Sequence, residues 1–141
     1  MEYRKGSHGV YDLKYHVVFC TKYRVLTGQV ADRTREIIRE ICAANYIDIA
    51  SSSMSPDHMH LLLSIPPSIS VSKAVQYIKG KSSRKLLQEF ELPRKRYWGQ
   101  HLWARGYFVV TVGNVNSNEV QKYIEEQEIH RKRDDFKISE F

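Results

Sequence analysis

The stretch from Ile47 to Ile65, "IDIASSSMSPDHMHLLLSI", predicts two strands joined by a tight turn. Pro56 and Asp57 are typical turn residues, and they separate "IDIASSSMS" from "HMHLLLSI". Because successive side chains of a strand point to opposite faces, the second strand has one apolar face. That face carries Met59, Leu61, Leu63 and Ile65. A hairpin of this kind needs a covering layer on its apolar side, which neighbouring helices would supply.

The segments on both sides of this hairpin alternate between strand and helix periods. Residues 10–23 alternate as a half-buried strand does, and residues 28–46 carry apolar side chains at helical spacing. Ser70 is a suitable N-cap for a second helix. The expected elements, in chain order, are strand 10–23, helix 28–46, strands 47–55 and 58–65, helix 71–87, strand 102–113 and helix 114–133.

This order predicts an α+β domain of the ferredoxin-like (RRM-like) type. Such a domain has a split βαβ antiparallel sheet with helices on one face, and here a further helix follows at the C-terminal end. The chain has 141 residues, of which 42% are hydrophobic, which is enough for one core. We expect a single domain over residues 1–141, with its core at 8–130 and a charged tail at 131–141. The fold by itself does not give the function.

The composition favours a polyanionic partner. Lys and Arg outnumber Asp and Glu by 22 to 16, a net charge of +6. Nucleic acid is the first candidate, although a soluble domain that is merely basic has the same balance.

Cys20 and Cys42 fit neither a disulfide framework nor a CxxC zinc pattern, so we expect small core residues. The first residues lack the apolar segment of a signal peptide, and no apolar run is long enough to cross a membrane, so we expect a cytoplasmic protein.

His58 and His60 are candidate metal ligands. They lie two apart on one strand, so both point to the face opposite the apolar layer, roughly 7 Å apart. Two imidazoles on one face can hold one divalent ion. The alternative is a pair of partly exposed strand histidines, and the spacing alone leaves both interpretations open.

Tyr123 and Gln127 form a second candidate pair on the last helix. They are four residues apart and share a helix face, while Val120 and Ile124 lie on an adjacent face that would pack inward. A tyrosine hydroxyl, with a pKa of about 10, is a poor nucleophile unless it or its target is activated, and a metal that polarises a phosphate gives such help. The amide oxygen of Gln127 would suit Mg²⁺ or Mn²⁺. A half-exposed tyrosine beside a solvated glutamine fits the same spacing.

A basic cluster lies between residues 79 and 105, a segment that contains eight Lys or Arg and only two Glu. Cations and hydroxyls at this density suit contacts with a phosphate backbone. The candidate DNA-binding residues are Lys79, Lys81, Ser82, Ser83, Arg84, Lys85, Arg94, Lys95, Arg96 and Arg105. The aromatic rings of Tyr97, Trp98, His101 and Trp103 offer planes for unpaired bases. The alternative is a solvated basic face with the tryptophans in the core.

Five segments taken together resemble one family. In chain order they are "YHVVFCTKYR", "SPDHMHLLLS", "IKGKSSRKL", "WARGYFVVTVG" and "VQKYIEEQ". This set is similar to the HUH single-tyrosine transposases of the insertion-sequence 200/605 group, where HUH denotes two histidines flanking one hydrophobic residue. The resemblance runs from about Tyr11 to Gln127. Each motif alone is weak, but five in order across so short a chain are highly specific.

The resemblance implies a role for each candidate residue. His58 and His60 match the HUH pair that binds a divalent metal, Mg²⁺ or Mn²⁺. Tyr123 matches the nucleophile, and Gln127, one helical turn later, matches a third metal ligand.

The resemblance also implies an activity. Members of the family cleave single-stranded DNA at transposon ends, join their tyrosine to the 5′ phosphate and leave a free 3′ hydroxyl, after which a second exchange rejoins DNA ends. They bind hairpins formed by subterminal palindromes. They are homodimers, and the tyrosine helix of one subunit can complete the metal site of the other.

Two other functions remain open at this point. One is a single-stranded nucleic-acid-binding module without catalysis, and the other is an HUH nuclease that serves host repeats or replication. Three polar residues have no assigned role in catalysis or metal binding. Asp57 fits a turn residue better than an orienting partner for a histidine, while His16 and His101 are open.

Overall fold

The computed structural model of the chain describes residues 4–5, 10–92, 101–112, 122 and 124–126. Within these residues the helices are α1 (Gly28–Ala44) and α2 (Val71–Glu89). The strands are β1 (Arg4–Lys5), β2 (Val10–Tyr11), β3 (Lys14–Cys20), β4 (Asp48–Ser55), β5 (His58–Ser64) and β6 (Phe108–Thr111).

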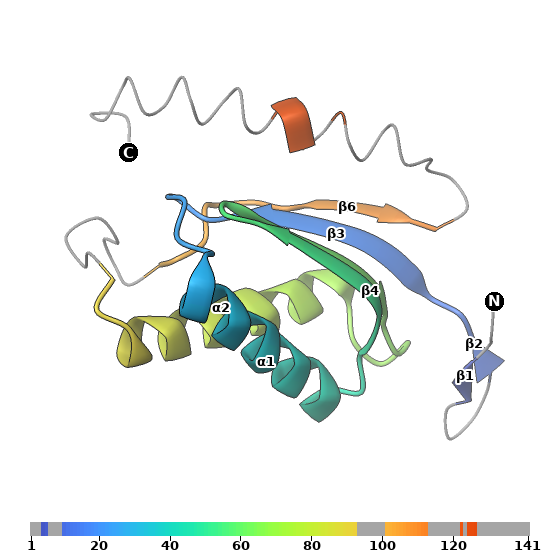
Figure 1. Ribbon diagram of the computed structural model, residues 1–141. Coiled ribbons are helices and arrows are strands. Elements are labelled where there is room, and N and C mark those ends of the chain that lie inside the picture. The colour runs from blue at the N-terminus through green and yellow to red at the C-terminus, as the bar shows by residue number, and fades with distance from the viewer. Residues whose placement is uncertain (1–3, 6–9, 93–100, 113–121, 123, 127–141) are drawn as a thin grey trace.

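The main sheet has four strands in the order β4-β5-β3-β6, and every neighbouring pair is antiparallel. Both helices lie on the same side of this sheet (Figure 1). This strand order, with a helix in each of the two crossovers, is that of the ferredoxin-like split βαβ, so the predicted fold class is confirmed.

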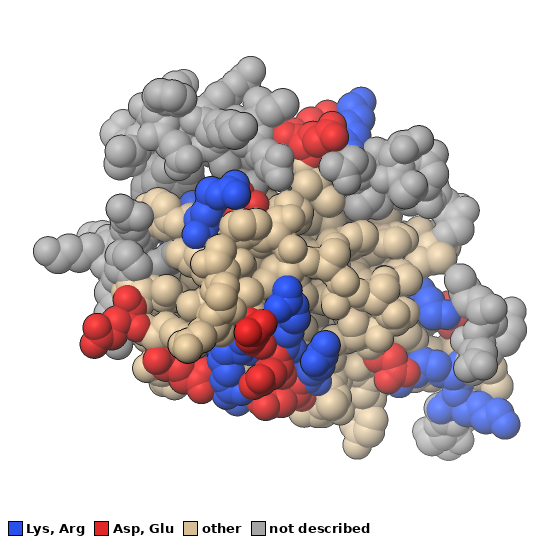
Figure 2. Space-filling view, in the orientation of Figure 1, with Lys and Arg blue, Asp and Glu red and all other residues tan. Residues whose placement is uncertain are grey.

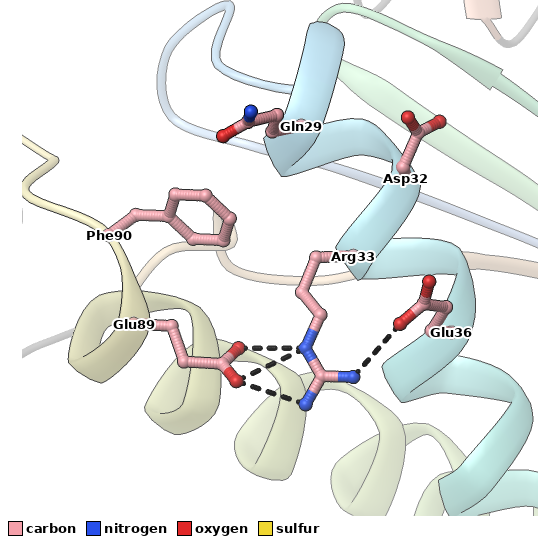
Figure 3. A pocket seen from close by; sticks show the side chains of 6 residues that line it. All are labelled: Gln29, Asp32, Arg33, Glu36, Glu89 and Phe90. Carbon is pink, nitrogen blue, oxygen red and sulfur yellow. Dashed lines mark hydrogen bonds and ion pairs between the residues drawn. The ribbon is translucent and has the colours of Figure 1, made fainter.

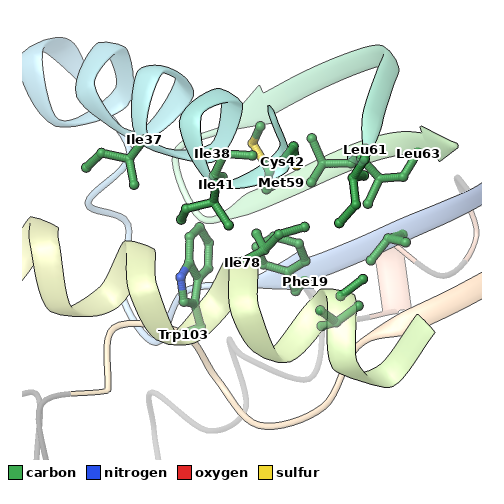
Figure 4. Packing of buried hydrophobic residues seen from close by; sticks show 14 of the residues in the cluster. Phe19, Ile37, Ile38, Ile41, Cys42, Met59, Leu61, Leu63, Ile78 and Trp103 are labelled. Carbon is green, nitrogen blue, oxygen red and sulfur yellow. The ribbon is translucent and has the colours of Figure 1, made fainter. Parts of the chain in front are cut away.

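The core lies between the sheet and the two helices (Figure 4). The four residues of the predicted apolar face of the 58–65 segment are at most 2% exposed, and helix α1 contributes Ile37, Ile38 and Ile41. Trp103 packs edge-on against Phe19, with 4.7 Å between the ring centroids. Cys20 and Cys42 are buried, as predicted, and neither forms a disulfide with a described residue. Burial raises the pKa of Cys42 to about 12.

The predicted strand 10–23 is divided in the structure. Its first residues form β2, which pairs with β1 in a separate two-stranded hairpin, and the main strand β3 begins at Lys14. The guanidinium of Arg4 donates hydrogen bonds to the carbonyls of Ser64 (2.9 Å) and Tyr46 (2.8 Å) and pairs with Asp48 (2.9 Å). This side chain ties the small hairpin to the end of the main sheet. These contacts are long-range, so the local alternation could not reveal them.

The predicted strand 102–113 is shorter than expected, because only Phe108–Thr111 form β6. Before it, Trp103 makes a single bridge to Thr21, and Gly106 takes a positive φ of 81°, a conformation that interrupts a strand. By contrast, the N-cap of α2 is as predicted, since the Ser70 hydroxyl accepts a hydrogen bond from the Lys73 amide at 3.1 Å.

Most of the predicted last helix lies outside the described residues. Residues 122 and 124–126 are helical, and this turn lies on the side of the sheet opposite α1 and α2 (Figure 1). The predicted tail at 131–141 also lies outside the described residues, so the predicted domain limits stay a prediction.

Two adjacent leucines of β5 test the alternation. Leu61 is fully buried in the core, whereas Leu62 is half-buried on the opposite face. We expect Leu61→Ala to lower the free energy of unfolding by about 2–5 kcal/mol, because it leaves a cavity, and Leu62→Ala to cost less than half of that. Urea denaturation of both variants measures the difference. Equal losses would contradict the assignment of the two faces.

Candidate functional site

The central strand β5 carries both candidate metal ligands on the face opposite the core. His60 pairs with Val18 of β3 on one side and with Ser53 of β4 on the other, and His58 occupies the next position on the same face. The predicted placement is therefore confirmed. The site is partly enclosed, since the residue exposure of His58 is only 8% and His60 is half-buried.

Asp57 holds the His58 ring. Its carboxylate oxygen lies 3.1 Å from His58 Nδ1, and because a carboxylate can only accept, Nδ1 carries the proton. This tautomer puts the lone pair of the ring on Nε2. The Asp57 side chain is buried and also pairs with Arg24 at 3.2 Å. Asp57 does form the turn, as predicted, but it also orients the imidazole, which corrects our preference for a turn role alone.

The turn before His58 is fixed by the loop that follows β3. The amide of Thr21 donates to the Asp57 carbonyl and that of Leu26 to the Pro56 carbonyl, both at 2.9 Å. These bonds place the Asp57 carboxylate at the end of β5, where the histidine pair begins.

His16 is a site residue that the sequence analysis left unassigned. Its Nδ1 lies 3.1 Å from Nε2 of His60, across the β3–β5 pairing. The pKa of His60 is lowered, first by burial and then by the neighbouring His16 and His58. The neutral imidazole, which is the form that binds metals, is thereby favoured. The alternation of β3 already placed His16 on the polar face, but only the strand order brings it to His60.

The donor set at this face fits a divalent ion in part. His58 and His60 supply two neutral nitrogens, and no cluster of three His, Cys, Asp or Glu side chains able to hold a metal lies within the described residues. Tyr123 and Gln127, the predicted nucleophile and third ligand, lie outside the described residues. Their helical neighbours at 124–126 lie on the side of the sheet away from α1 and α2 (Figure 1), which is also the side of the histidines.

Three of the predicted DNA contacts have partners inside the protein. The Lys79 ammonium donates to the carbonyls of Ala104 (2.9 Å) and Gly106 (2.8 Å), and burial lowers its pKa. Ser82 and Ser83 are buried. Ser82 accepts from the Trp103 indole and Ser83 from the Leu102 amide, both at 2.9 Å. These two serines are therefore not surface contacts, which corrects the sequence prediction. They bind Leu102 and Trp103 to α2.

Four other predicted DNA contacts are exposed and lie on α2 or just before β6: Lys81, Arg84, Lys85 and Arg105. Lys81 and Lys73 both lie over the ring of Tyr77, with their ammonium groups 5.3 and 5.4 Å from its centroid. Arg94, Lys95 and Arg96 lie outside the described residues. Lys73, Lys81 and Arg84 are exposed on the outer side of α2. These three residues are called the basic stripe below.

The predicted aromatic platform is smaller than expected. Trp103 is 4% exposed and belongs to the core, so it does not offer a plane for a base. His101 is exposed, and Tyr97 and Trp98 lie outside the described residues.

A hollow of about 340 Å³ lies between α1 and the end of α2 (Figure 3). Arg33 crosses it and binds Glu89 (2.9 Å) and Glu36 (3.1 Å). The Arg33 guanidinium lowers the pKa of Glu89 through their hydrogen bonds. Figure 2 shows acidic and basic side chains interleaved over this helical side. Because the Arg33 charge is already balanced by carboxylates and the histidines lie across the sheet, this hollow is not part of the candidate site.

Comparison with known proteins decides the family. A sequence profile described as "Transposase IS200 like" matches residues 9–127. The chain belongs to the IS200-like transposase family. The chain is 39% identical over 129 residues to the ISDra2 transposase TnpA of Deinococcus radiodurans, covering 90% of this chain and 92% of that protein. It is 38% identical over 123 residues to the transposase for insertion sequence element IS200 of Salmonella typhimurium, covering 86% and 80%.

Two solved structures share this fold. A crystal structure of a Deinococcus radiodurans R1 protein described as a transposase has a TM-score of 0.78 and 34% identity, covering 88% of this chain and 97% of that one. The REP-associated tyrosine transposase bound to a REP hairpin has a TM-score of 0.55 and 15% identity, covering 87% and 67%, and shares the fold. Among the described residues, no helix is long and apolar enough to cross a membrane.

A comparison of Lys79 and Lys81 variants distinguishes a structural lysine from a surface lysine. We expect Lys79→Met to lower the free energy of unfolding by roughly 1–3 kcal/mol, because two charge-assisted hydrogen bonds are lost. Lys81→Met, two residues away and exposed, should leave unfolding almost unchanged. Thermal and urea unfolding of the two variants measure this contrast. A Lys79 variant as stable as the parent would show that the hydrogen bonds from Lys79 to Ala104 and Gly106 do not stabilise the fold.

Proposed function

We propose that this transposase cleaves and rejoins single-stranded DNA at insertion-sequence ends, through a metal-dependent reaction with a covalent 5′-phosphotyrosine intermediate. The observation that carries the proposal is the pair His58 and His60, held side by side on the polar face of β5 in a chain of this family. The Asp57 carboxylate on His58 Nδ1 supports it, because ligating histidines are commonly oriented by such a partner.

In this proposal His58, His60 and Gln127 hold Mg²⁺ or Mn²⁺. Gln127 is assigned from the resemblance, one helical turn after Tyr123. Three neutral ligands leave the ion nearly its full charge, and its chemistry here would be to polarise the scissile phosphate.

Tyr123 is the proposed nucleophile. Its oxygen attacks the phosphorus, the bond from phosphorus to the 3′ oxygen breaks, and the tyrosine is left joined to the 5′ phosphate. The proton lost by the phenol is balanced by the one gained by the new 3′ hydroxyl. Because the phosphotyrosine bond keeps the energy of the broken phosphodiester, rejoining needs no ATP. The sequence accordingly has no phosphate-cradling glycine-rich motif.

The proposed substrate is single-stranded DNA that forms hairpins near the transposon ends. The exposed cations of α2 support this, because phosphate contacts give affinity without reading bases. A structural neighbour bound to a REP hairpin is consistent with it. We also propose a homodimer in which the tyrosine helix of one subunit can complete the metal site of its partner.

A binding module without catalysis is the main alternative. It would need the basic stripe on α2 but not two histidines and a tyrosine in the family pattern. Covalent chemistry therefore separates the two functions.

Tyr123→Phe tests the nucleophile. We expect the parent protein, given Mg²⁺ and single-stranded DNA carrying an insertion-sequence end, to form a covalent adduct visible on a denaturing gel. The phenylalanine variant, which lacks only the attacking oxygen, should form none while it still binds the DNA. Binding by both forms with no adduct from either would favour the binding module.

His58→Ala and His60→Ala test the metal site. We expect each to reduce cleavage to background while the hairpin affinity stays within about twofold, because the basic stripe lies on the other side of the sheet. Gel shift and cleavage assays on the same DNA give the two quantities. A loss of hairpin affinity as large as the loss of cleavage would count against separate sites.

A further inference from the structure

His16 is the side chain that meets His60 at the candidate metal site. The two rings are tilted by 37° with centroids 5.3 Å apart, and the contact joins His16 Nδ1 to His60 Nε2 at 3.1 Å. The sequence pattern and the family assignment give His16 no role. The inference below rests on the proposed function, since it concerns the ion that His58 and His60 would share.

The strand register fixes where His16 lies along β5. His60 is opposite Val18, while His16 is opposite Leu62, two residues further along β5. His16 is thus a diagonal neighbour of His60, on the side away from His58. The His60 nitrogen that contacts His16 is Nε2, so this nitrogen is directed toward β3 and away from His58.

Each histidine of the pair has a ring nitrogen that meets a side-chain partner. For His58 it is Nδ1, which donates to Asp57, and for His60 it is Nε2, which meets His16. In this arrangement, an ion shared by the pair would be bound through the opposite nitrogens, Nε2 of His58 and Nδ1 of His60. In metal sites the second nitrogen of a ligating histidine almost always donates its proton to a neighbouring acceptor.

We propose that His16 is a positioning residue of the metal site. Its Nδ1 accepts the proton of His60 Nε2, and this bond fixes the His60 tautomer and ring orientation that present the Nδ1 lone pair to the ion. His16 thus does for His60 what Asp57 does for His58.

The backbone around His16 is suited to this role. Strand β3 is central, so His16 has a paired residue on each side, Leu62 of β5 and Val110 of β6. The half-buried imidazole is carried by a backbone with ladder partners on both sides. A residue on a loop or an edge strand could not hold a neighbouring ring with the same precision.

The tautomer of His60 is the direct readout. We expect ¹⁵N–¹H correlation spectra of the metal-free protein to show His60 protonated at Nε2. In His16→Phe, which keeps a ring but removes the acceptor, the Nε2–H and Nδ1–H forms should both appear. A parent protein with His60 protonated at Nδ1 would overturn the inference, whatever the activity.

Metal affinity is the second readout, measured by calorimetry with Mn²⁺ alone. We expect His16→Phe to weaken Mn²⁺ binding by about 10- to 100-fold, the usual effect of removing such a partner. His16→Asn, whose amide oxygen can accept near the position of Nδ1, should recover most of the affinity. His101→Phe removes an exposed histidine outside the sheet and serves as the matched control, with unchanged affinity.

The variants also separate this inference from the proposed function. If the parent binds Mn²⁺, His58→Ala abolishes binding and His16→Phe binds as the parent does, the metal site stands and the role of His16 is wrong. If the parent binds no Mn²⁺, both are wrong. Equal unfolding temperatures of the His16→Phe variant and the parent in EDTA would show that the loss of affinity in that variant is not a loss of fold.

Discussion

The register of β5 between β4 and β3 is the constraint on which the rest of the structure depends. In this register Met59, Leu61 and Leu63 enter the core while His58 and His60 face the other side. A slip by one residue would exchange the two sets, bury two imidazoles under the helices and expose the leucines. The burial that stabilises the fold is therefore also what holds the histidines side by side.

Contacts from outside β5 then set the orientation of each ring. The loop after β3 holds the Pro56–Asp57 turn, and Asp57 holds His58. The other histidine, His60, contacts His16 of β3. Both partners come from residues that are placed by the β3–β5 pairing and its adjoining loop, so ring orientation depends on the same register as the core.

Local patterns predicted the fold and the placement of the histidines correctly, because alternation and helical spacing report directly which face is buried. The apolar face of β5 and the Ser70 cap are examples.

Ser82 was wrongly predicted to be a surface residue, although its spacing of four from Ile78 and Leu86 put it on the buried stripe of α2. Its hydroxyl suggested exposure, but the indole of Trp103 satisfies it inside the protein. The pairing of His16 with His60 could not be predicted, because it depends on which strands are neighbours. Tyr123 and Gln127 are still assigned by the family pattern.

The central claim is that His58 and His60 together hold a divalent ion. Anomalous X-ray scattering at the manganese edge, from crystals grown with Mn²⁺, tests it most directly. The account predicts a peak about 2 Å from one ring nitrogen of each histidine, on the sheet face opposite α1 and α2. Manganese found only among the carboxylates around Arg33, with none between His58 and His60, would contradict it.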